Sequence, residues 1–156
     1  MKYCLVTVGR IKEPFISAGI RLYQERIARY ADFQILPVKE EKEVKGSSPA
    51  LIMNREAARI LEKVPRDGIW LALDRQGPPT DSRQFFSLLT RYADQGRTRA
   101  YFIVGGPWGL APTLVEMADR VLSLSPLTFT HEMAALVLTE QLYRFLNFRA
   151  GEKYHR

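Results

Sequence analysis

The chain contains the stretch Ala100-Tyr101-Phe102-Ile103-Val104-Gly105-Gly106-Pro107-Trp108-Gly109-Leu110. Its five leading apolar residues are typical of a strand that is buried on both faces of a sheet. The glycines and the proline that follow end this strand in a loop. In α/β proteins, a loop of small residues at the carboxyl end of a strand often binds a ligand, although it can also be a plain turn. We therefore predict a strand over 100–104 and a candidate ligand loop over 105–111.

Outward from this strand, apolar runs alternate with helical patterns along the whole chain. Strands are predicted at residues 3–8, 33–38, 69–73 and 121–124, and helices from Pro14, from the end of a charged loop at 39–49, from a cap at Asp81 or Ser82, at 112–118 and at 132–149. This alternation predicts an α/β fold with a parallel sheet and helices on both faces. At 156 residues, 1–156 fits a single domain.

The composition narrows the class of protein. Apolar residues make up 46% and charged residues 26%, as in ordinary globular proteins, and no apolar run has the length of a membrane span. The single cysteine, Cys4, excludes an internal disulfide and predicts a reducing, cytoplasmic location. A net charge of +6 favours a polyanionic partner, but the excess is spread thinly along the chain. On charge alone, nucleic-acid binding and a merely basic soluble protein remain equally open.

The last predicted helix carries more apolar residues than one buried stripe needs. They are Met133, Ala134, Leu136, Val137, Leu138, Leu142, Phe145, Leu146 and Phe148. One interpretation is a central helix that is buried by its own chain. The other, which we prefer, is that one face packs on the sheet and the other on a second subunit.

Several familiar sites are excluded by spacing. The loop at 105–109 lacks the spacing of a dinucleotide fingerprint, and no Gly-Lys-Ser/Thr follows it. His131-Glu132 begins like a zinc-protease motif, but Ala135 stands where the second histidine would be. With two histidines and one cysteine in the chain, we expect no metal site. What remains is a glycine-lined pocket at the carboxyl ends of three strands, of a kind that can bind an adenosine-like ligand.

Four segments together resemble the RlmH family, the ribosomal large-subunit pseudouridine N3-methyltransferases of the SPOUT superfamily. These segments are Ile103–Pro107, Ser123–Phe129 with His131, Glu140–Arg144 and the terminal Tyr154-His155-Arg156. The resemblance covers essentially the whole chain. It implies a SPOUT-type parallel-sheet fold with a C-terminal trefoil knot, which sequence rules would not predict because knots are almost absent from folded chains.

The resemblance also implies a cofactor, a substrate and partners. The cofactor would be S-adenosyl-L-methionine, with no metal, and the substrate a pseudouridine in helix 69 of 23S rRNA on the assembled ribosome. The protein would be a homodimer without membrane attachment. The positions that match the family's cofactor site are Leu73, Gly105, Leu124, Ser125, Pro126, Leu127, Thr128 and Phe129.

The terminal residues would act on the acceptor base. His155 would take the proton from N3 or position the uracil edge, since imidazole titrates near neutral pH. Tyr154 would stack on the base or hydrogen-bond to it, and Arg156 would bind a phosphate. Without the resemblance, a terminal histidine is more often a solvated residue. Glu140 and Arg144 fit an ordinary ion pair one helical turn apart, or a pair that organises a partner's tail.

Three positions depart from the family pattern. Ala135 replaces a common arginine, Thr130 replaces a common proline, and Trp108 stands where relatives are often polar or acidic. Trp108 could stack on a base or lie in a core or interface. Two rival functions remain: a SPOUT enzyme that acts on tRNA or another rRNA site, and a cofactor-free RNA-binding or ribosome-assembly protein with the same fold.

Overall fold

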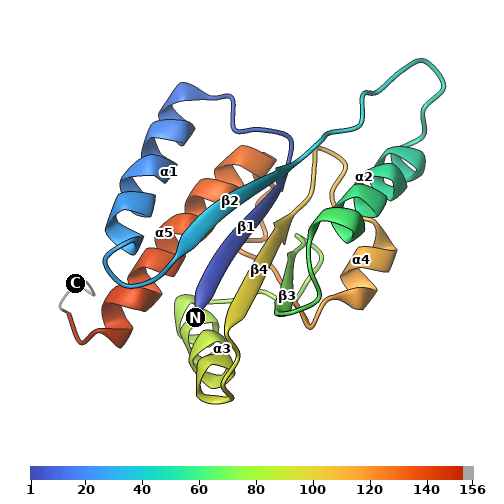
Figure 1. The fold of residues 1–156 in the computed structure, drawn as a ribbon. Helices are drawn as coiled ribbons and strands as arrows, with labels where there is room; N and C mark the ends of the chain where they lie inside the picture. The colour runs from blue at the N-terminus through green and yellow to red at the C-terminus, as the bar shows by residue number, and fades with distance from the viewer. Residues whose placement is uncertain (153–156) are drawn as a thin grey trace.

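The computed structural model describes residues 1–152, and its five strands form one sheet flanked by five helices (Figure 1). The elements are β1 (Lys2–Val8), α1 (Pro14–Ile27), β2 (Phe33–Val38), α2 (Pro49–Lys63), β3 (Ile69–Leu73), α3 (Ser82–Asp94), β4 (Arg99–Val104), α4 (Pro112–Met117), β5 (Arg120–Leu122) and α5 (His131–Arg149). All strand pairs are parallel, in the order β2-β1-β4-β3-β5. The predicted α/β class and parallel sheet are confirmed.

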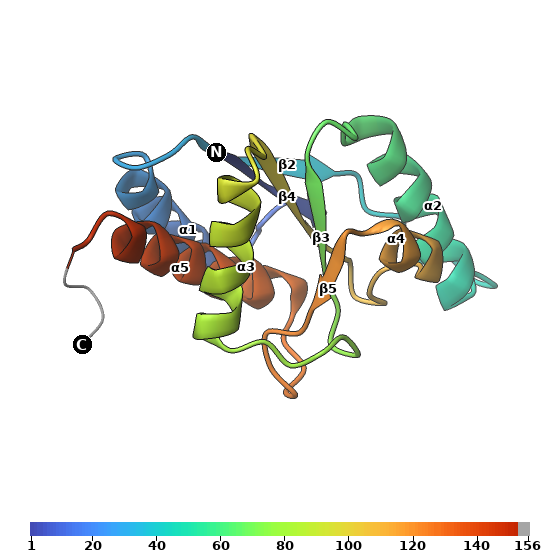
Figure 2. The ribbon, with the colours of Figure 1, turned by 90° about the horizontal axis from the view of Figure 1, so that it is seen from below.

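Helices cover both faces of the sheet, as predicted. Because side chains alternate along a strand, Tyr3 and Leu5 of β1 face one side and Cys4 and Val6 the other. The first pair packs in a core with α1, α3 and α5, and the second in a core with α2 and α4. Figure 2 shows these two helical layers on opposite sides of the strands. Both faces are therefore buried, which explains the continuous apolar runs of the central strands.

Helix starts follow the expected capping chemistry. The side chain of Ser48 accepts a hydrogen bond from the N–H of Leu51 at the start of α2. Asp81 caps α3 in a reciprocal capping box with Gln84, so Asp81, and not Ser82, is the cap. Thr130 caps α5 through the N–H of Met133.

Two boundaries differ from the predictions. β5 spans Arg120–Leu122 instead of 121–124, because the chain after Leu122 pairs only at the single bridge between Ser123 and Pro79. α5 begins at His131, one residue earlier than predicted, because Thr130 is its cap.

α5 runs parallel to α1 and lies between α1 and α3 on its face of the sheet (Figure 2). Gly19 of α1 allows this close approach, since a Cβ there would lie 2.9 Å from Leu136 Cδ1. Ala135, Leu138 and Leu142 are fully buried within the chain's own core. The excess of apolar residues in α5 is thus largely explained by packing within one chain. A second subunit on its outer side stays a prediction.

Candidate functional site at the carboxyl edge of the sheet

The carboxyl ends of three neighbouring strands bring the predicted cofactor residues to one edge. Leu73, the last residue of β3, pairs with Val104 of β4 on one side and with Leu122 of β5 on the other. Gly105 follows β4 directly, and the predicted cofactor segment begins two residues after β5. Three segments that are well separated in the chain therefore meet, as expected for a ligand site in a parallel sheet.

The loop after β3 is held against the segment after β5 by backbone hydrogen bonds. The N–H groups of Asp74 and Thr80 donate to the carbonyls of Leu122 and Ser123, each at 3.0 Å, and the N–H of Ser123 donates to Pro78 at 3.1 Å. The buried Ser123 hydroxyl also donates to the carbonyl of Ser125 at 3.1 Å. The start of the predicted cofactor segment is thus fixed by its neighbours.

The loop after β4 folds back tightly on itself. The N–H of Gly109 donates to the carbonyl of Gly106 at 3.0 Å, and Gly109 has a φ of +88°, which favours glycine. A Cβ on Gly105 would lie 2.5 Å from the backbone carbon and oxygen of Gly109. Glycine at position 105 is therefore required for the loop to close, which gives the Gly105-Gly106 pair a definite structural role.

Accessible apolar side chains surround these loops. Leu73, Leu124 and Phe129 are half-buried, whereas Leu127 is 72% exposed and Trp108 47% exposed. Exposed apolar side chains beside a tight glycine loop can contact the flat face of an aromatic ring, while backbone groups contact its polar edge. Trp108 does not lie in the core of its own chain, so contact with a base and a place in an interface both remain open.

A carboxylate in the first turn of α5 joins this helix to the start of α1. Glu132, which is buried, accepts hydrogen bonds from the N–H groups of Lys12 at 3.1 Å and Glu13 at 3.0 Å. It thereby caps α1, whose own N-cap residue, Glu13, makes no side-chain capping bond. His131 is the first residue of α5 and not its cap, and its Nε2 lies 3.9 Å from Glu132 Oε1. Sequence reasoning missed Glu132 because its partners lie about 120 positions away.

A second buried carboxylate lies behind the glycine loop. Glu56 is only 3% exposed, and its Oε1 accepts the N–H of Glu41 at 3.0 Å. Its Oε2 would lie 3.0 Å from a Cβ on Gly106. Burial raises the pKa of this carboxyl, and the hydrogen bond from Glu41 partly opposes the shift. An acidic residue on the buried stripe of α2 is the only sequence signal that could have identified it.

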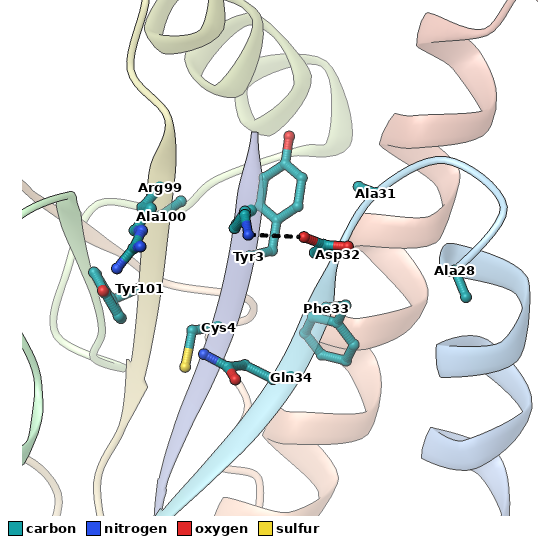
Figure 3. A pocket seen from close by; sticks show the side chains of 11 residues that line it. Tyr3, Cys4, Ala28, Ala31, Asp32, Phe33, Gln34, Arg99, Ala100 and Tyr101 are labelled. Atoms are coloured by element: carbon teal, nitrogen blue, oxygen red, sulfur yellow. Dashed lines mark ion pairs between the residues drawn. The ribbon is translucent and has the colours of Figure 1, made fainter.

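A separate cavity of about 450 Å³ lies at the opposite, amino edge of the sheet (Figure 3). Its charged lining residues pair with nearby carboxylates: Lys2 with Asp32 at 3.1 Å, and Arg99 with Asp67 at 2.6 Å. Burial raises the pKa of the Cys4 thiol to about 11, so this lining cysteine is a poor nucleophile. None of the predicted site residues within 1–152 lines this cavity.

The predicted catalytic residues Tyr154, His155 and Arg156 lie outside the described residues. Glu140 and Arg144 form the predicted ion pair along α5. Ala135 is fully buried, so its side chain is not part of an exposed RNA-binding surface.

Glu152 lies far from the carboxyl-edge loops of its own chain. α5 contains 19 residues, so its ends lie roughly 28 Å apart. Thr130 and the predicted cofactor segment adjoin its first residue, whereas the N–H of Glu152 bonds to Asn147 in its last turn. Glu152, the last described residue, is therefore at the far end of α5 from the predicted cofactor segment.

Comparisons with known proteins identify the family of this chain. A family profile described as predicted SPOUT methyltransferase matches residues 1–155. The chain belongs to the SPOUT methyltransferase family. Among SPOUT relatives, a protein from Syntrophotalea carbinolica is 38% identical over 155 residues, covering 99% of both chains. Another, from Desulfotalea psychrophila, is 36% identical over 157 residues, covering all of both chains. Both are named ribosomal RNA large subunit methyltransferase H.

A solved structure shares the fold of this chain. A probable methyltransferase from Bordetella pertussis Tohama I superposes with a TM-score of 0.58 at 14% identity, covering 93% of this chain and 96% of the other. At this identity the similarity concerns the fold alone.

Proposed function

We propose that this SPOUT methyltransferase transfers a methyl group from S-adenosyl-L-methionine to N3 of a pseudouridine in helix 69 of 23S rRNA, on the assembled ribosome in the cytoplasm. The observation that carries the proposal is the meeting of Leu73, Gly105 and the 124–129 segment at one edge of the sheet. Full-length relatives named ribosomal RNA large subunit methyltransferase H support the choice of substrate.

The residues at this edge fit the cofactor. An adenosine moiety needs apolar contact for its ring and polar backbone groups for its edge, and Leu73, Leu124 and Phe129 are apolar and accessible beside buried glycines. Gly105 and the 124–129 segment would hold the cofactor, which supplies an electrophilic methyl group on a positively charged sulfur. In such a displacement, the protein's main contribution is to align the acceptor nitrogen with that methyl group.

The acceptor nitrogen must also lose a proton, because N3 of pseudouridine is an imide nitrogen. We assign this step to His155, either as the base or by positioning the uracil edge. Tyr154 would contact the base and Arg156 a phosphate. Proton transfer by a positioned side chain contributes about 10²- to 10⁴-fold to a rate.

The protein would act as a homodimer in which each site combines loops from one chain with terminal residues from the other. The position of Glu152 at the end of α5 far from the loops of its own chain supports this arrangement. Exposed apolar side chains on α1 support it further: Phe15 is 63% exposed, and the exposed Leu22 lines a groove with Ser17 and Ala18.

The trefoil knot is part of the same proposal. In a knotted chain, the segment after β5 would pass through the loop that follows β3. The close hydrogen bonding between residues 122–123 and 74–80 supports this path.

The decisive experiment is methyl transfer from labelled S-adenosyl-L-methionine to ribosomes from a methylation-deficient strain, with the product nucleoside identified by mass spectrometry. A methylated pseudouridine in 23S rRNA is expected. Labelling of free tRNA or of another rRNA site would replace the proposed substrate. Absence of both cofactor binding and transfer would favour a ribosome-assembly protein.

Differently tagged subunits test the shared site. One subunit lacks residues 154–156, and the other carries Gly105→Ala. Purified heterodimers then contain one complete site of two, so about half of the wild-type rate is expected, although each variant homodimer is inactive. Inactive heterodimers would show that the terminal residues serve their own chain.

A further inference from the structure

Three side chains converge where the terminal segment leaves the fold. The Tyr30 hydroxyl donates a hydrogen bond to Glu152 Oε2 at 2.8 Å. Asn147 Nδ2 donates to the same carboxylate oxygen at 3.0 Å and to the Tyr30 hydroxyl oxygen at 3.2 Å. The result is a closed triangle that joins the chain after α1 to the chain after α5, across 122 positions of sequence. We refer to Tyr30, Asn147 and Glu152 as the tail clasp.

The backbone already ends α5 without these side chains. Gly151 has a φ of +76°, and the N–H groups of Ala150, Gly151 and Glu152 donate to carbonyls of the last helical turn. These bonds stop the helix and are available to any sequence with glycine at this position. The clasp adds something different, because it fixes the side chain of Glu152 relative to α1 and not only relative to its own helix.

The tail clasp combines two buried or half-buried residues with one exposed carboxylate. Asn147 is 2% exposed, so its amide is held by the core, and Tyr30 is half-buried. Glu152 lies at the surface, where a carboxylate would otherwise be free to move with the solvent-exposed chain. Its hydrogen bond to Tyr30 raises the pKa of the tyrosine, with burial as a smaller cause, so the phenol keeps the proton that it donates. A buried amide and a tyrosine thus hold an exposed carboxylate in one place.

We propose that Tyr30, Asn147 and Glu152 are positioning residues that set the direction in which residues 153–156 leave the fold, toward the site of a second copy. This inference rests on the proposed function, because it gives the clasp its role through Tyr154, His155 and Arg156. His155 is only three residues beyond Glu152, so the placement of Glu152 restricts the region that the imidazole can reach. An error in the direction of Glu152 would therefore displace the imidazole by ångströms, and misplacement by about 1 Å can cost roughly 100-fold in rate.

Steady-state methyl transfer with Tyr30→Phe and Glu152→Ala tests the proposal. The expected result is a fall in kcat of about tenfold for each, with an unchanged Kd for S-adenosyl-L-methionine and an unchanged dimer. Glu152→Gln keeps an oxygen acceptor and is expected to recover part of the rate. Tyr101→Phe is the matched control, since its hydroxyl donates to the Asp67 carboxylate at 2.7 Å, at the amino edge of the sheet. That control is expected to keep the wild-type kcat.

A double-mutant cycle separates positioning from general stability. In a chain that lacks residues 154–156, the clasp substitutions are expected to cause no further loss of the residual rate, because the residues that they position are absent. A wild-type kcat in Glu152→Ala, an equal fall in Tyr101→Phe, or a full further loss in the shortened chain would each overturn the inference. Failure of the wild-type protein to methylate ribosomes is a different result, visible before any variant is compared, and would remove the proposed function and the clasp's role with it.

Discussion

The two edges of the sheet differ in the side chains that they expose. At the carboxyl edge, tight backbone loops bring together glycines, small residues and exposed apolar side chains such as Leu127. The amino edge has a defined cavity (Figure 3) that Lys2 and Arg99 line, and each of these two residues is paired with an aspartate of the same chain. The charges of Lys2 and Arg99 are therefore already neutralised within the chain, whereas the loop edge offers apolar surface that a ligand could cover. A cavity alone is a poor guide to a ligand site in this protein.

Removal of residues 154–156 is expected to have the largest effect on the rate of methyl transfer. The deletion is made beyond the end of α5, at the amino edge of the sheet, but under the proposed function it disables the site at the carboxyl edge of the partner subunit. Methyl transfer should fall by about 10²- to 10⁴-fold, the usual contribution of a positioned proton-transfer group. Cofactor affinity, measured by calorimetry, and dimerisation, measured by sedimentation, should stay near wild type. Full activity in the shortened protein would remove the terminal residues from the mechanism.

A pair of glycine substitutions compares the edges directly. Gly105→Ala places a Cβ 2.5 Å from Gly109, and Gly68→Ala, before β3, places one 2.8 Å from Arg99. Both should lower the free energy of unfolding by about 1–3 kcal/mol through overpacking. Only Gly105→Ala should also weaken cofactor binding, by tenfold or more (order of magnitude), because it opens the ligand loop. Equal cofactor affinities in the two variants would refute the assignment of the loop.

The sequence was sufficient to predict the strands of the sheet but not the side-chain contacts between distant parts of the chain. Buried strands such as β4 are continuous apolar runs, and Asp81 with Gln84 carries a local capping signature, so both could be predicted. Glu132, Glu56 and the tail clasp could not, because each depends on partners that only the folded chain brings close. The end of β5 was predicted two residues too late, because beyond Leu122 the chain runs beside the irregular loop after β3, which no periodicity describes.

Glu132→Gln tests how far the carboxyl edge depends on the capping of α1. An amide offers one acceptor where the carboxylate offers two, so one of the N–H groups of Lys12 and Glu13 loses its partner. Chemical denaturation should show a loss of about 1–3 kcal/mol. Glu62→Gln, on the exposed side of α2, should stay within about 0.5 kcal/mol of wild type. Similar losses in both variants would count against a specific cap.

Substitution of Glu56 is expected to have the smallest effect on stability, and this effect should depend on pH. Because its pKa is raised in the folded state, its contribution to stability is fully present below its ordinary pKa and is lost as the pH rises through the raised value. Glu56→Gln keeps an acceptor for Glu41 and never ionises. Its melting temperature relative to wild type should therefore be higher at pH 7 than at pH 4. The opposite trend would show that the ionised carboxylate is favoured behind the glycine loop.

The two ends of α5 have a consequence for how this chain can vary. Glu132 fixes the first turn to the start of α1, and Asn147 fixes the last turn to Tyr30 beyond its end. One residue inserted between them would rotate the far end by about 100° and shift it by about 1.5 Å. α5 therefore cannot gain or lose a single residue and keep both the contact of Glu132 with the start of α1 and that of Asn147 with Tyr30. The length of α5 is thus constrained by the contacts at its two ends.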